Sequence, residues 1–319
     1  MNLNTDKPPF SRRSSPTSSL SFNDSMSVGS SDSAIPVNVG YPVRVEYVNC
    51  CENSTVILMT LNLISFLLVC ITNSFAVFGF FTSKSIMNIS ETYSNVLTLP
   101  YNAFIIWPVI SVYLLIFCIA QFTNKQIVQT NIKKVYMFFT ISNAANIAWS
   151  IIFTIGTPLS AAISTVPLFI LLGSLYAIQL YTNPFDYSHT LSKKLFTDVP
   201  LGLYIGWAVP CAFLNIGYAL KAYNVELADD TYFFIGFSII LIPFYLTLLI
   251  KHKNLASFVI FLYTFVAYSF KYYDNYTLTT GISLLLLLMT IFFVVYLIIY
   301  IKNYQHYHKN NLHKPTVIN

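Results

Sequence analysis

Charged residues are scarce in this 319-residue chain. Asp, Glu, Lys and Arg make up 9% of it, against 55% hydrophobic residues, whereas soluble domains carry roughly 25% charged residues. All twelve Asp and Glu and all five His lie in connecting segments or tails, outside the long apolar stretches. Ion-coupled carriers, proton pumps and voltage sensors rely on ionisable groups inside the membrane. The sequence therefore argues against these classes.

Chemistry for catalysis is also missing. No Lys in an apolar segment offers a Schiff base, no carboxylate pair there offers acid/base catalysis, and no His/Glu grouping offers a metal site. His189 and Asp198, both in a connecting segment, are the remaining acid/base candidates. No nucleic-acid motif is present. We therefore predict a protein that is not an enzyme, has no metal or cofactor of its own and has no nucleic-acid partner.

Long apolar segments are what the chain has instead. Most approach the roughly 20 residues that span a bilayer. Eight of them occupy residues 56–81, 103–121, 135–155, 159–181, 200–220, 232–250, 255–270 and 279–301. These lengths predict an all-α integral membrane protein with about eight transmembrane helices and the lipid bilayer as its main partner.

Basic residues predict its orientation. Threading the eight segments through a membrane places fourteen of the seventeen Lys and Arg on one side, and only Lys84, Lys221 and Lys271 on the other. Short basic loops stay in the cytoplasm, so both termini are expected to be cytoplasmic. The same bias favours the plasma membrane or the endomembrane system.

The ends of the chain differ from its middle. Residues 1–54 are predicted to form a disordered cytoplasmic tail, because eleven Ser lie between Ser11 and Ser33 and no apolar run can bury a core. Residues 303–319 form a second polar tail. Cys50 and Cys51 precede the first span on the cytoplasmic side, where disulfides are disfavoured and palmitoylation is a possible modification.

The three Trp residues stand in distinctive phrases. Residues 98–107 read TLPYNAFIIW, residues 146–150 read NIAWS, and residues 200–207 read PLGLYIGW, followed by Leu214 and Asn215. In these phrases the chain resembles the TspO/MBR family, the translocator proteins and tryptophan-rich sensory proteins, and especially its longer microbial members with extra C-terminal helices. The departures are Tyr101, near where a Trp of the short translocator proteins would lie, and Leu99, which replaces the first Pro of a Pro pair.

The resemblance implies an architecture and a class of ligand. It covers residues 56–221 and implies a five-helix bundle over residues 55–221, followed by three further transmembrane helices over residues 222–302. Tetrapyrroles or sterol-like lipids are the implied ligands, with porphyrin or haem bound as a ligand. The family also makes the mitochondrial outer membrane a possible location.

Depth along the helices suggests a binding site. At ~1.5 Å per residue, Trp107, Trp149 and Asn215 lie at similar depths below the side with few basic residues. Asn146 is one turn from Trp149 on the same helix face. We predict a pocket between the second, third and fifth helices, covered by residues 82–102. An interfacial aromatic belt and hydrogen bonds between helices are the structural alternatives.

Two other groups of residues complete the expected site. Tyr101 and Trp207 are candidate ligand contacts, although Trp207 lies deeper and could serve packing alone. Leu214, Tyr218 and Lys221 fit a proposed cholesterol-contact pattern, and Tyr and Lys at a helix end are also ordinary interface anchors.

Three functions remain open at this point. The favoured one is binding or translocation of an apolar, planar ligand between helices. The alternative is a carrier of small neutral solutes, with Pro167, Pro210 and Pro243 as possible helix breaks. Catalytic breakdown of tetrapyrroles is a third possibility. The oligomeric state stays open.

Overall fold

The computed structural model describes residues 43–123, 131–225 and 230–311. By its contacts the chain divides into Met1–Arg44 and Val45–Asn319, and the second unit contains the helical bundle. The Ser-rich tail and the side chains of Cys50 and Cys51 lie outside the described residues, so the predicted disorder and palmitoylation stay predictions.

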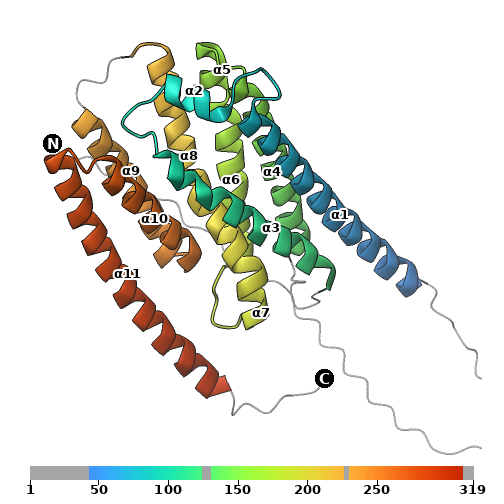
Figure 1. Cartoon of the computed structure of the whole chain (residues 1–319). Helices are drawn as coiled ribbons and strands as arrows, with labels where there is room; N and C mark the ends of the chain where they lie inside the picture. The colour runs from blue at the N-terminus through green and yellow to red at the C-terminus, as the bar shows by residue number, and fades with distance from the viewer. Residues whose placement is uncertain (1–42, 124–130, 226–229, 312–319) are drawn as a thin grey trace, which may run out of the picture. The chain divides into compact units, whose positions relative to one another are not determined.

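Helices and their connections account for the described residues (Figure 1). The short elements next to the long helices are α2 (Ile86–Thr92), the 3-10 helix η1 (Tyr101–Ile105), α5 (Pro158–Ile163), α7 (Leu191–Lys193) and the π-helical turn η3 (Lys194–Asp198). The long helices are α1 (Val43–Phe78), α3 (Ile106–Thr123), α4 (Ile132–Thr154), α6 (Thr165–Thr182), α8 (Val199–Ala222), α9 (Asp230–Ile250), α10 (Leu255–Lys271) and α11 (Tyr276–Asn311).

Seven of the eight predicted apolar segments correspond to one long helix each, and segment 159–181 is divided between α5 and α6, which confirms an all-α multipass membrane protein. Seven helical stretches in the described residues are long and apolar enough to cross a membrane, and α10 is a shorter apolar helix. Helix α1 already begins at Val43, inside the predicted tail, and α11 continues to Asn311, past the predicted end of the last span. Pro210 and Pro243 lie within the continuous helices α8 and α9, and Pro167 within α6. Pro210 and Pro243 therefore mark no break, whereas Pro167 lies in the first turn of α6, directly after Ser164, where α5 ends and α6 begins.

Two glycines bring α8 and α10 close together. A Cβ on Gly202 would lie 2.5 Å from Oδ1 of Asn254, and one on Gly206 would lie 2.9 Å from the Cα of Ser257. Small residues four apart allow membrane helices to approach at backbone distance. The hydroxyl of Tyr245 on α9 donates to the Gly206 carbonyl at the same place. Helix α10 is thereby part of the bundle core.

Contacts between connections define two ends of the bundle. At the first, called end A, Lys133 bonds to Ser54 (2.7 Å) and Lys134 lies over the Tyr181 ring. Lys253, before α10, bonds to Asp186 in the loop after α6. At the second, end B, Lys271 at the close of α10 reaches the loop before α3. Helix α10 therefore runs from one end to the other.

The N-terminal part of α1 and the C-terminal part of α11 lie at the same end of the bundle. Ser54 of α1 is at end A, and Asn303 of α11 bonds to Tyr187 of the loop there. Figure 1 shows α7 at this end, and α2 and α5 at end B. That end A faces the cytoplasm remains a prediction from the basic residues.

Candidate ligand-binding site

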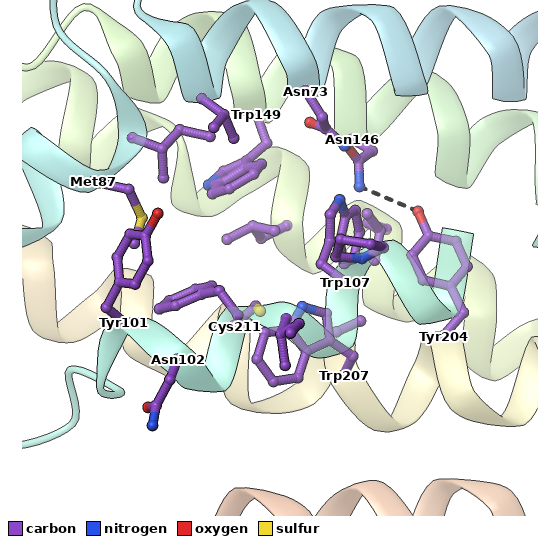
Figure 2. Close-up of a pocket in the computed structure, with 18 residues that line it drawn as sticks. Asn73, Met87, Tyr101, Asn102, Trp107, Asn146, Trp149, Tyr204, Trp207 and Cys211 are labelled. Carbon is purple, nitrogen blue, oxygen red and sulfur yellow. Dashed lines mark hydrogen bonds between the residues drawn. The ribbon is translucent and has the colours of Figure 1, made fainter. Parts of the chain in front are cut away.

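A cavity of about 520 Å³ lies between the helices near end B. Its walls are mainly apolar and aromatic, and no Asp, Glu, His, Lys or Arg is among the described residues that line it. The lining residues are Asn73, Val77, Ile86, Met87, Tyr101, Asn102, Phe104, Ile105, Trp107, Pro108, Asn146, Trp149, Leu168, Leu171, Tyr204, Trp207, Ala208 and Cys211. They come from α1, α2, η1, α3, α4, α6 and α8, so five long helices converge on one space (Figure 2).

All three tryptophans of the chain line this cavity. Trp107 comes from α3, Trp149 from α4 and Trp207 from α8. The Trp207 ring meets Phe104 edge to face at 5.9 Å, and Trp107 meets Tyr204 in a similar way at 6.1 Å. Edge-to-face pairs hold aromatic rings at defined angles. These pairs fix part of the aromatic wall in place.

Polar groups gather at one end of the cavity. The Asn146 amide donates to the Tyr204 hydroxyl at 3.3 Å, shown as the dashed line in Figure 2, and its oxygen accepts from Asn73 at 3.1 Å. Ser150 donates to the Asn73 oxygen. All four residues are buried. Because each polar partner is neutral, this end offers hydrogen bonds without charge.

The connection between α1 and α3, residues 82–105, forms a roof over the cavity and contributes Ile86, Met87 and η1. A capping box starts α2: the Ser85 side chain accepts from the Asn88 N–H, and the Asn88 side chain accepts from the Ser85 N–H. Tyr101 and Ile105 are 74% and 70% exposed. The predicted cover over residues 82–102 is thus present as a short helix and a 3-10 turn, with an apolar rim.

Asn215 is the predicted site residue that the structure keeps out of the cavity lining. Its oxygen accepts from the Trp149 indole N–H at 3.1 Å. Its amide donates to the Ala161 carbonyl (3.0 Å) and to the hydroxyls of Ser164 and Thr165 (3.0 and 2.8 Å). Asn215 therefore holds the Trp149 ring from behind and ties α8 to α5 and α6, which is the structural alternative raised from the sequence.

The cholesterol-contact pattern does not form one surface. Leu214 and Tyr218 are buried, and the Tyr218 hydroxyl is hydrogen-bonded to Ser90 of α2, while Lys221 is exposed. The bundle thus covers two of the three residues. The predicted sterol contact stays a prediction.

Sequence reasoning missed several wall residues. It expected the second, third and fifth spans, and the structure adds Asn73 and Val77 from α1 and Leu168 and Leu171 from α6. It also missed Tyr204, Ala208 and Cys211. Their signal was available, because with Trp207 they recur at three- and four-residue intervals and share one face of α8. No comparable pattern singles out the α6 leucines.

A second polar cluster lies at end A, away from the cavity. The predicted acid/base candidates do meet: His189 Nδ1 lies 2.9 Å from Asp198 Oδ2, and Lys193 Nζ lies 2.5 Å from His189 Nε2. An ammonium group can only donate, so Nε2 accepts from Lys193 and Nδ1–H donates to the carboxylate. Asp198 also accepts the Phe185 N–H at 2.8 Å, and its Oδ1 has no hydrogen-bond partner among the described residues. This His189 cluster joins α7, η3 and the loop after α6.

Near this cluster lies the more exposed Asp186. Burial raises its pKa, but the hydrogen bonds from the Ser188 N–H and hydroxyl and the charge of Lys253 outweigh it, so its pKa lies below the ordinary value. The Lys253 ammonium lies 3.5 Å from its carboxylate. Asp186 therefore stays ionised at neutral pH and ties the loop to the start of α10.

Comparison with known families places the chain. A family model described as TSPO-like protein matches residues 59–302. No curated protein and no solved structure gave a match. The family match continues past residue 221, where the resemblance in sequence ended, and includes α9, α10 and most of α11. The match covers most of the chain and agrees with the TspO/MBR resemblance, so this integral membrane protein belongs to the TSPO-like family.

Proposed function

We propose that the protein binds an apolar, planar small molecule, of the tetrapyrrole or sterol-like class, in the cavity at end B. The observation that carries the proposal is that all three tryptophans of the chain line one cavity. Its volume of about 520 Å³ falls within the roughly 300–1,000 Å³ of small-molecule sites, which combine apolar walls with a few polar groups. Trp107, Trp149 and Trp207 would stack on the ligand, and Asn146 would orient it.

The rim indicates the side from which the ligand arrives. Val77, Tyr101 and Ile105 are 46%, 74% and 70% exposed and all line the cavity. An exposed apolar rim on a membrane protein favours a ligand that partitions into the bilayer over a hydrophilic one from water. Catalytic breakdown of the ligand is less supported, because no carboxylate, His or Lys of the described residues lines the cavity.

Tryptophan fluorescence tests this proposal directly. Protoporphyrin IX is titrated into the purified protein in lipid nanodiscs, and quenching reports contact because every Trp lies in the cavity wall. In a Trp107→Phe/Trp149→Phe double variant, Trp207 remains as the reporter, and we expect a dissociation constant raised on the order of tenfold, about 1.4 kcal/mol. Phe169→Leu is the matched control, since Phe169 is 44% exposed on α6 and does not line the cavity.

Double-variant binding as tight as wild type would remove the cavity assignment. Competition separates the two ligand classes: cholesterol that displaces the porphyrin supports a shared sterol-like site, whereas cholesterol without effect leaves the tetrapyrrole class.

A row of hydrogen-bonded polar side chains favours transport of a small neutral solute as a second candidate function. From the cavity toward end A, Asn73 bonds to Asn146, Asn143 to Ser65 (2.9 Å), and Thr140 to Asn62 (2.7 Å). Asn62 also donates to Gln121 at 3.2 Å. Within the described residues, Asn143 Oδ1, Gln121 Nε2 and the Tyr136 hydroxyl are buried without a partner. Such groups can hydrogen-bond a small neutral solute along α1 and α4.

Solute flux distinguishes the two candidates. Proteoliposomes are exposed to a glycerol gradient and their swelling is recorded. Swelling faster than in protein-free vesicles, and slowed by Asn143→Leu, supports a carrier. Porphyrin binding without such swelling supports a binding protein.

A further inference from the structure

Helix α10 holds the roof of the cavity through hydrogen bonds to the backbone carbonyls of the roof loop. The Lys271 ammonium donates to the carbonyls of Asn95 (2.9 Å), Val96 (3.3 Å) and Thr98 (2.7 Å). Three carbonyl oxygens around one cation form a built site for positive charge. Lys271 is only partly exposed, so the ammonium exchanges much of its hydration for these oxygens.

Three tyrosines of the same helical region also donate hydrogen bonds to carbonyls of this loop. The Tyr268 hydroxyl donates to the Leu97 carbonyl at 2.7 Å, and the Tyr272 hydroxyl donates to the Val96 carbonyl. One helical turn and more before them, Tyr263 donates to the Ala103 carbonyl at 2.8 Å. The segment from Val96 to Ala103, which includes the start of η1, is therefore bonded to this helical region at both of its ends.

The loop itself is arranged to present these carbonyls. The Leu97 N–H donates to the Asn95 side chain, and the Asn95 N–H donates to the Thr98 side chain, both at 2.9 Å. These side-chain bonds form a local turn and satisfy the amides on its inner side. The outer carbonyls are then able to accept from α10.

Helix α8 holds the loop from the other side. A Cβ on Gly217 would lie 2.8 Å from the Asn95 side chain, so the loop lies against the bare backbone of α8. Tyr101, Asn102, Phe104 and Ile105, which line the cavity, follow directly along the chain.

We infer that α10 is a positioning element for the ligand site: Lys271, Tyr263, Tyr268 and Tyr272 hold the loop 95–103 and thereby set the position of the roof residues that face the ligand. This inference rests on the proposed function for the identity of the ligand. It gives a role to one of the C-terminal helices, whose own residues do not line the cavity.

Hydrogen exchange tests these hydrogen bonds without any ligand. In nanodiscs, Lys271→Met removes the donor to three carbonyls, so we expect faster amide exchange in the peptide covering residues 93–105 and unchanged exchange in α4. Lys271→Arg keeps a cationic donor and is expected to restore slow exchange. Lys221→Met is the matched control, because Lys221 is also an end-B Lys and its side chain is exposed. Unchanged exchange in both Lys271→Met and a Tyr268→Phe/Tyr272→Phe variant would overturn the inference.

Porphyrin titration of the same variants links these hydrogen bonds to the site. We expect Lys271→Met to raise the dissociation constant for protoporphyrin IX on the order of tenfold, about 1.4 kcal/mol, and Lys271→Arg to return it toward wild type. Faster exchange with unchanged porphyrin affinity would overturn the positioning role. If the wild-type protein fails to bind porphyrin at all, the proposed function fails, while the exchange result still decides whether α10 holds the roof.

Discussion

The cavity at end B and the His189 cluster at end A differ in their polar groups, which are neutral in the cavity and ionisable in the cluster. The cavity has neutral partners only, with Asn73, Asn146 and Tyr204 in a hydrogen-bonded chain. The His189 cluster concentrates ionisable groups, with Asp198 at 0% side-chain exposure beside His189. A neutral wall can lose its ligand and remain satisfied, whereas a buried charge needs its partner at all times. The cavity is therefore suited to reversible binding, and the His189 cluster to holding the fold together.

Removing a charge from the His189 cluster is the largest expected effect. Asp198→Asn leaves Lys193 and His189 without their anion, and loss of one buried partner costs about 3 to 5 kcal/mol in free energy of unfolding. Porphyrin affinity is expected to be unchanged, since the cavity is at the other end. The measurement is unfolding in mixed detergent–SDS micelles. Asp186→Asn is the control, because its partly exposed pair with Lys253 is worth less than about 1 kcal/mol. Equal losses for both variants would contradict the contrast.

Filling the cavity is expected to have the opposite effect: weaker porphyrin binding without a loss of stability. Ala208 lines it and is buried, so Ala208→Phe occupies space that a ligand needs. We expect porphyrin binding weakened more than about tenfold, with the free energy of unfolding unchanged or raised by about 0.5 to 2 kcal/mol. Fluorescence titration and detergent unfolding measure the two. Ala144→Phe places the same ring on an exposed position of α4 and is expected to change neither. Lost stability with retained binding would count against a functional cavity.

Breaking the chain of neutral hydrogen bonds at the cavity should cost less free energy of unfolding than removing a charge from the His189 cluster. Asn146→Ala removes the bonds to Asn73 and Tyr204, and hydrogen bonds between membrane helices contribute about 0.6 kcal/mol each on average. We therefore expect a loss of about 1 kcal/mol in free energy of unfolding. Ser74→Ala provides the comparison, because Ser74 bonds within its own helix, to the Cys70 carbonyl, and should have almost no effect. A loss for Asn146→Ala as large as that for Asp198→Asn would erase the distinction between the two regions.

The smallest expected effect is the pH dependence due to Asp186. Its pKa is lowered in the folded protein, so its contribution to stability is fully present above the unfolded pKa of about 3.9. That contribution is lost as pH falls through the lower folded value. The difference in melting temperature between wild type and Asp186→Asn should be constant above about pH 5 and shrink below about pH 4. A difference that grows on acidification would show that the pairing is unfavourable.

Sequence reasoning predicted the residues that line the cavity better than the residues that hold them in place. Trp107, Trp149, Trp207, Tyr101 and Asn146 were expected around a pocket, and all five line one cavity. Their use in binding remains our proposal. Trp107 and Trp149 were expected to lie together because rare aromatic residues at similar depths are visible in a linear sequence, whereas Trp207 was expected to lie deeper. Asn215 was expected to line the pocket and instead bonds to Trp149 outside the lining, since periodicity gives depth along a helix but not which face meets which neighbour.

The sequence by itself determined that the protein is a bundle of apolar membrane helices, because span length and the absence of charge from the apolar segments depend only on local composition. Its three Trp-containing phrases indicated the TspO type. Only the tertiary structure decided that Lys271 of α10 reaches back about 175 residues to the roof loop, and that His189, Lys193 and Asp198 share one cluster. The reason is physical. Hydrophobicity drives each segment into the bilayer independently, whereas these contacts depend on how helices pack sideways. A local pattern such as Gly202 and Gly206, four residues apart, predicts a close approach between helices but not which helix approaches.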